Sequence, residues 1–123
     1  MSSEEVRLAV PALPEYVRLA RLTAAGLASR LGFSYDEVED LRIAVDELCY
    51  LLVGPEGREG TVTLTYAMEG TSLVIVGQGA AGPRAAEFAD LSEQILAAIV
   101  DEYEVTRADD TVTFRMVRHQ QHQ

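Results

Sequence analysis

The sequence predicts an α+β protein: a two-layer sandwich in which helices cover one face of a mixed, mostly antiparallel β-sheet. Three observations predict this class. Four segments alternate apolar and polar residues as half-buried strands do, and a fifth is a short apolar run that follows one of them after a turn. Three further segments carry apolar residues at helical spacing, and the two kinds are interleaved. The order strand, helix, helix, strand, strand, helix, strand, strand buries its apolar surface most economically as one sheet with the helices on a single face.

Length and composition indicate one cytoplasmic domain. The 123 residues, 48% of them apolar, suffice for a core without disulfides, and we expect a domain over residues 1–118 and a disordered, metal-free tail over residues 119–123. The lone Cys49 indicates a reducing compartment and a buried structural thiol. We expect no membrane span, because no apolar run is long enough. A net charge of −10 opposes direct binding to nucleic acid, and it fits either a basic protein partner or a role in solubility alone.

The first part of the chain predicts a strand and a helix. Residues Glu5 to Val10 alternate as a strand does, and prolines end it. The first helix begins near Pro14 and runs to Gly32. Its expected inward stripe consists of Tyr16, Ala20, Thr23, Leu27 and Leu31. The link to the next helix is short, so we expect the two helices to pack together.

A central helix is predicted from Ser34 to Gly54. Ser34 and Glu37 form a capping box at its start, and a Gly-Pro pair ends it. One face carries apolar residues at spacings of three and four and is expected to face a core: Val38, Leu41, Val45, Leu48 and Leu52.

The opposite face of this helix combines a carboxylate with hydrocarbon. It holds Asp40, Ile43, Glu47 and Leu51. A solvent-exposed face would not normally carry Ile and Leu around a carboxylate, so we expect this face to be covered too. Glu47 would then point into a pocket or cleft, which makes it the first candidate functional residue. The alternative is a surface carboxylate or a relic of an ancestral site.

The second half predicts two hairpins separated by a loop and a third helix. The segments are strands Thr61 to Met68 and Leu73 to Val76, a flexible loop from Gly77 to Pro83, a helix from Arg84 to Val100, and strands Asp101 to Arg107 and Thr111 to Val117. The inward residues expected on the third helix are Phe88, Leu91, Ile95, Leu96 and Ile99.

The element order, together with the segments Asp40 to Cys49 and Leu73 to Gly79, resembles the bacterial anti-sigma factors that are also serine-protein kinases. These belong to the GHKL superfamily, which includes the histidine kinases. The resemblance covers nearly the whole chain. It implies a histidine-kinase-like ATPase fold, and a homodimer that uses the sheet and the surface of the first helix.

The same resemblance implies a degenerate ATP site. In the family a Glu on the central helix activates the attacking group, and an Asn four residues later holds Mg²⁺. Glu47 matches the Glu, but the Asn position is Leu51, whose side chain cannot ligate a hard cation. The family's Asp-x-Gly-x-Gly motif falls on Gly77, Gly79 and Ala81, so one of its three residues remains. The lid segment lacks its Gly-x-Gly. We therefore expect no cofactor, with ATP and Mg²⁺ bound only if the degenerate site still functions.

The resemblance also implies a protein partner. The segment Ala20 to Thr23 resembles the one whose Arg contacts the sigma factor and the anti-anti-sigma protein, which makes Arg21 the candidate; the alternative is a solvated surface residue. The predicted function is an anti-sigma factor that sequesters a sigma factor until an anti-anti-sigma protein releases it, a pseudokinase. Two alternatives are an active serine-protein kinase in which Asp46 or Asp40 supplies the Mg²⁺ oxygen, and a scaffold module.

Overall fold

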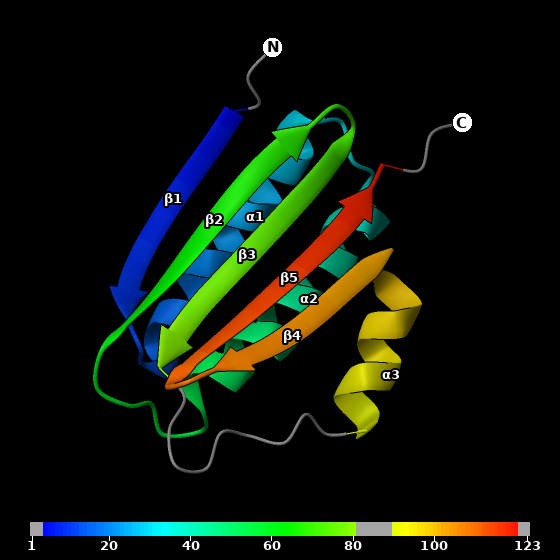
Figure 1. The fold of residues 1–123 in the computed structure, drawn as a ribbon. Helices are drawn as coiled ribbons and strands as arrows, with labels where there is room; N and C mark the ends of the chain where they lie inside the picture. Colours follow the sequence, from blue (N-terminus) through cyan, green and yellow to red (C-terminus); the bar gives the residue numbers. More distant parts are fainter. Residues whose placement is uncertain (1–3, 81–89, 121–123) are drawn as a thin grey trace.

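The protein is a two-layer sandwich with one sheet and one helical layer. The computed structural model describes residues 4–80 and 90–120. Figure 1 shows α1 and α2 lying across one face of the sheet, with α3 at the side of β4. The elements are β1 (Glu4–Pro11), a 3-10 turn (Pro14–Tyr16), α1 (Val17–Arg30), α2 (Tyr35–Val53), β2 (Thr61–Glu69), β3 (Ser72–Ala80), α3 (Asp90–Ile99), β4 (Glu102–Ala108) and β5 (Thr111–His119).

The sheet is antiparallel throughout its described strands. Its order is β1-β2-β3-β5-β4, so the two hairpins lie side by side and β1 and β4 form the edges. All four neighbouring pairs are antiparallel, and the parallel pairing expected of a mixed sheet is therefore missing from this part of the chain. Of the helices in the described ranges, none combines the length and the apolar character needed to span a bilayer.

Both long helices start and stop where local chemistry dictates. The backbone N–H of Ser34 donates to Glu37 Oε1 at 2.7 Å, and the backbone N–H of Glu37 donates to Ser34 Oγ at 3.2 Å, so the predicted capping box is confirmed. Gly54 ends α2 with a φ of 77°, a conformation that suits glycine. At the end of α1, Gly32 has a φ of 88°, and the chain reverses there to bring α2 alongside α1.

The core lies between the two layers. The inward face of α2 is buried as predicted, apart from a half-buried Val38. The inward stripe of α1 is confirmed in part. Ala20 is buried as predicted, and Tyr16, Leu27 and Leu31 pack against the core at its edge. The most deeply buried residues are Ala20, Ala24 and Ala28, of which the last two were not predicted. These small side chains let the backbone of α1 approach the sheet, and the Tyr66 hydroxyl of β2 donates to the Ala20 carbonyl at 3.0 Å. Burial raises the pKa of that hydroxyl.

Two predictions around the third helix need correction. The first part of the expected loop is strand, because β3 continues to Ala80 and pairs with β5 along its length. On α3, Leu96 is buried as expected but Leu91 is 66% exposed, so Leu91 does not face the core. The remainder of the expected loop and the start of the predicted helix, including Phe88, fall outside the described residues.

The expected C-terminal tail is ordered at its beginning. β5 extends to His119, whose backbone N–H donates to Asp101 Oδ2 at 2.7 Å. The side-chain amide of Gln120 then donates to the Gly32 carbonyl at 2.7 Å, linking the end of the sheet to the connection between the helices. A tail beginning at residue 119 is therefore wrong, and residues 121–123 lie outside the described range.

Candidate functional site

Glu47 lies on the side of α2 that faces α3. Its carboxylate oxygen Oε1 accepts a hydrogen bond from the Ser92 hydroxyl at a donor–acceptor distance of 2.6 Å. The side chain is half-buried rather than free in solvent. The residue that the sequence singled out therefore has a hydroxyl partner supplied by the chain itself.

Leu51, one helical turn beyond Glu47, is part of the hydrophobic core. Its exposed fraction is 3%, and it belongs to the same buried cluster as Leu48 and Leu52. Ile43, one turn before Glu47, is 44% exposed. The prediction that this face is covered is thus right at Leu51 and wrong at Ile43. Because a leucine side chain has no oxygen, position 51 offers no ligand to a hard cation.

Gly77 and Gly79 lie within β3, and the space for a side chain is filled at Gly77 but not at Gly79. Gly77 lies directly opposite Phe114 of β5, and a Cβ built at Gly77 would come within 2.3 Å of the fully buried Phe114 ring. A Cβ at Gly79 would make ordinary contacts, 3.5 Å from Val62 and 3.6 Å from Leu52. An aspartate side chain at position 77 would occupy the same space as the Phe114 ring. Gly77 therefore serves the packing of β3 against Phe114 of β5, whereas Gly79 is not required by its neighbours.

The two other carboxylates considered as cation ligands are each paired with an arginine. Asp46 Oδ1 lies 2.7 Å from Arg21 Nη1, and Asp40 Oδ2 lies 3.4 Å from Arg118 Nη2. Burial raises the pKa of the Asp40 carboxyl, and the Arg118 guanidinium opposes that shift. Within residues 4–80 and 90–120, no group of three or more His, Cys, Asp and Glu side chains could hold a metal ion.

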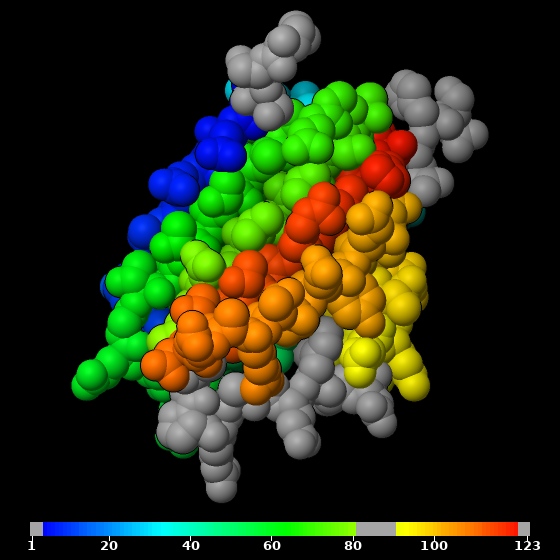
Figure 2. Space-filling model, in the orientation of Figure 1, coloured from blue at the N-terminus to red at the C-terminus, as the bar shows by residue number. Residues whose placement is uncertain are grey.

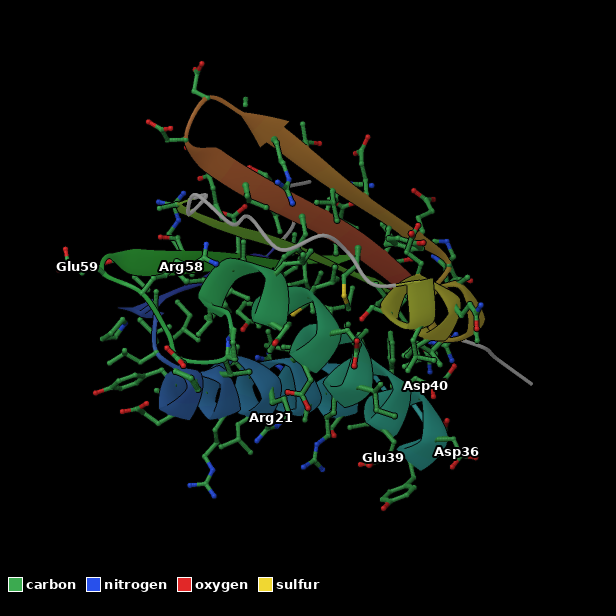
Figure 3. All side chains as sticks on the ribbon, turned by 90° about the horizontal axis from the view of Figure 1, so that it is seen from below. Arg21, Asp36, Glu39, Asp40, Arg58 and Glu59 are labelled. Carbon is green, nitrogen blue, oxygen red and sulfur yellow. The ribbon has the colours of Figure 1, made fainter. Side chains whose placement is uncertain are left out.

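Arg21 projects from α1 to α2, where it pairs with Asp46. Figure 3 shows it on α1, with the labelled carboxylates Asp36, Glu39 and Asp40 further along the helical layer at the start of α2. Its ion pair with Asp46 leaves both side chains partly exposed. The exposed large apolar residues of this layer include Leu22 next to Arg21, and Ile43 and Tyr50, which flank Asp46 on α2. An arginine with aromatic and aliphatic neighbours is typical of protein-binding surfaces.

Cys49 is a structural residue. Its thiol is buried, and this burial raises its pKa to about 12. A thiol with such a pKa is almost entirely protonated at neutral pH and is a poor nucleophile. The prediction of a buried, inert cysteine is confirmed by its burial.

Three residues that define the region were not singled out by the sequence analysis. Ser92 binds Glu47, Phe114 fills the space beside Gly77, and Arg58 Nη1 donates to the Ala80 carbonyl at 2.9 Å at the end of β3. In Figure 3, Arg58 lies at the opposite end of α2 from Asp40. Each contact joins positions at least 22 residues apart, and no local pattern marks them.

Two open hollows lie on the surface, away from Glu47. One is bordered by the end of α3 and the start of β4, and the other by the end of β1 and the link over residues 56–60. None of the site residues predicted from the sequence lines either hollow. Neither hollow is therefore lined by Glu47 or Leu51.

Comparison with known families and proteins identifies relatives of the chain. Residues 10–118 match the family model described as the histidine kinase-like ATPase domain. The chain is 43% identical over 70 residues to the serine-protein kinase RsbW of Bacillus subtilis (strain 168), a match that covers 54% of this chain and 44% of the relative.

Further relatives carry the same name. The serine-protein kinase RsbW of Bacillus pumilus (strain SAFR-032) is 41% identical over 76 residues, covering 58% of this chain and 47% of the relative. That of Bacillus cereus (strain B4264) is 40% identical over 67 residues, covering 53% and 42%. The matches thus span less than half the length of these relatives.

Proposed function

The chain belongs to the histidine kinase-like ATPase domain family, and from that premise we propose that it is a cytoplasmic anti-sigma factor that acts by binding alone. It sequesters a sigma factor by direct contact, and an anti-anti-sigma protein releases that factor by competition. In this proposal the chain is a pseudokinase: Glu47 is retained from an ancestral nucleotide site that no longer binds ATP and Mg²⁺.

The observation that carries the proposal is the contact between Phe114 and Gly77. By the family resemblance, the side chain at position 77 would be an aspartate that recognises the adenine of ATP. Here the Phe114 ring lies within 2.3 Å of where even a Cβ would be. The buried Leu51 supports the same conclusion, because no oxygen is available where the family holds Mg²⁺.

The proposed partner surface is the outer side of α1 and α2 around Arg21. Its arginine and exposed apolar residues suit a partner that carries a carboxylate among apolar side chains. Asp46 already pairs with Arg21, which orients the guanidinium on the surface. A carboxylate of the partner would either replace Asp46 as the ion-pair partner of Arg21 or bind Arg21 together with Asp46.

The proposed homodimer uses the outer face of the sheet and the surface of α1. Figure 2 shows the strands of the sheet forming the visible face of the molecule. This face carries a central aliphatic pair, Val74 opposite Val117, within a surface rich in threonine. Both valines are buried within the single chain, and their neighbours on this face are Ala67, Val76, Glu102 and Arg115. The exposed ion pair between Arg115 and Glu102 borders the two valines, so a second copy that packs on this face would cover charged as well as apolar side chains.

The nucleotide half of the proposal is tested by isothermal titration with Mg·ATP. We expect no heat of binding from this chain under conditions in which the Bacillus subtilis relative, titrated in parallel as the positive control, is assayed. Micromolar binding together with phosphate transfer to a protein would instead establish the alternative, an active serine-protein kinase. That alternative is favoured by the names of the relatives and by the retention of Glu47.

The partner half is tested by pull-down from the native cell with the Arg21→Glu variant. We expect the wild-type chain to recover a sigma factor or an anti-anti-sigma protein, and Arg21→Glu to lose it while its free energy of unfolding changes by less than about 1 kcal/mol. Arg30→Glu is the matched control, because Arg30 is exposed on the same helix but distant along it. Equal recovery by all three chains would show that this surface is wrongly assigned, and recovery of neither partner would favour a scaffold.

A further inference from the structure

The helix α3 is short and packs against the core through Leu96 and Ile99. It comprises ten residues, Asp90–Ile99, and an isolated helix this short is marginal in water. Leu96 is its fully buried side chain, whereas Leu91 is largely exposed. The stability of α3 therefore depends on the contacts that hold it against α2 and β4.

Two of those contacts pair a carboxylate with a hydroxyl. Ser92 donates to Glu47 of α2 at 2.6 Å. On the other side, Glu93 forms a side-chain hydrogen bond with Tyr103 of β4, and burial together with this carboxylate raises the pKa of the Tyr103 hydroxyl. The residue of the ancestral site is thus part of the attachment of α3.

We propose that the hydrogen bond between Ser92 and Glu47 is a latch that holds α3 against α2. The same hydrogen bond fastens α3 to the central helix. This inference rests on the proposed function, in which Glu47 is released from catalysis and serves packing.

The physical basis of the latch is the strength of a hydrogen bond to an ionised group. A hydroxyl that donates to a carboxylate over 2.6 Å is a short, charge-assisted contact, and such contacts are stronger than neutral ones. Because the contact is half-buried, water competes for it less than at an open surface. Removing either partner leaves the other with an incomplete set of hydrogen bonds.

The latch is tested by hydrogen exchange of the backbone amides of α3 in the variants Ser92→Ala, Glu47→Ala and their double variant. We expect each single variant to exchange about tenfold faster than wild type in α3, as the strength of a charge-assisted hydrogen bond implies. The double variant should be no faster than either single one, because both remove the same contact. Ser92→Thr, which keeps the hydroxyl, should retain protection.

The control is Ser29→Ala, an exposed serine near the end of α1, which should leave exchange in α3 unchanged. Unchanged exchange in Ser92→Ala, or multiplicative effects in the double variant, would overturn the latch. Mg·ATP titration of the same proteins separates the two proposals. Binding by the wild-type chain would overturn the proposed function while the exchange result still decides the latch.

Discussion

The two ends of α2 hold carboxylates in contrasting surroundings. At its start, Glu37 is buried and Asp40 is half-buried, and the guanidinium of Arg118 faces both, 3.9 Å from Glu37 and 3.4 Å from Asp40. Further along, the Glu47 carboxylate accepts a hydrogen bond from the neutral Ser92 hydroxyl, and Leu51, one helical turn later, is buried in the core.

The contrast teaches that a carboxylate on a covered helix face does not by itself mark a catalytic site. At the start of α2 the charges are compensated and serve to join the helix to β5. In the function proposed above, Glu47 lacks the oxygen ligand that metal-assisted phosphoryl transfer requires, because position 51 is a buried leucine. Whether a carboxylate is structural or catalytic is therefore judged from the residues around it.

The largest effect is expected when position 77 receives the aspartate that the family resemblance implies there. Gly77→Asp is expected to destabilise the protein by about 4 kcal/mol or more, because it forces a charged side chain into the space of the Phe114 ring. The measurement is urea unfolding followed by circular dichroism. Gly77→Ala should also be costly, since its Cβ alone meets the ring.

The matched control for this glycine is Gly26, in the interior of α1, where a Cβ would meet nothing within 4 Å. Gly26→Ala should stabilise the protein by about 0.5–1 kcal/mol, the helix preference for alanine over glycine. If Gly77→Ala behaved like Gly26→Ala, Phe114 would not be what excludes a side chain from this position.

The charged end of α2 is tested by Arg118→Met. This change keeps the hydrocarbon but leaves Glu37 and Asp40 without their cation, so we expect a loss of about 3 kcal/mol in the free energy of unfolding. Arg115→Met is the control, because its ion pair with Glu102 is exposed and should change stability by less than about 0.5 kcal/mol. If both variants lost the same free energy of unfolding, the burial of Arg118, Glu37 and Asp40 would not make their interaction stronger than an exposed ion pair.

The smallest expected effect concerns the pH dependence of stability. Burial raises the pKa of Asp40 above its usual value near 3.8, with Arg118 opposing and Asp36 and Glu37 adding to the rise. The folded state thus binds this proton more tightly than the unfolded chain, so the contribution of Asp40 favours folding at low pH and is lost as pH rises through the folded pKa. Asp40→Asn should remove this decline, as measured by urea unfolding between about pH 4 and pH 7.

The control for this prediction is Glu104→Gln on the exposed face of β4, which should keep the wild-type profile. A decline of the same size in Asp40→Asn would show that another group produces it. Stability that falls further in Asp40→Asn as pH rises would mean that the ion pair with Arg118 outweighs the cost of burying the carboxylate.

Much of the fold could be predicted because its signals are local. The capping box at Ser34, the alternation in β2 and the turn between β4 and β5 each depend on residues within a few positions of one another. Predictions failed where a glycine-rich segment was interpreted without knowing its neighbours. Gly77 and Gly79 suggested a loop, but they are paired residues of β3 because β5 lies beside them.

The sequence by itself determined the order of the elements, their caps and the absence of a Mg²⁺ oxygen at Leu51, because each of these depends on residue type and short spacing. Only the tertiary structure decided that Phe114 lies against Gly77, that Ser92 reaches Glu47, and that Arg118 meets Asp40 from 78 residues away. Those contacts follow from strand register and helix docking, which the packing of the whole chain sets at once.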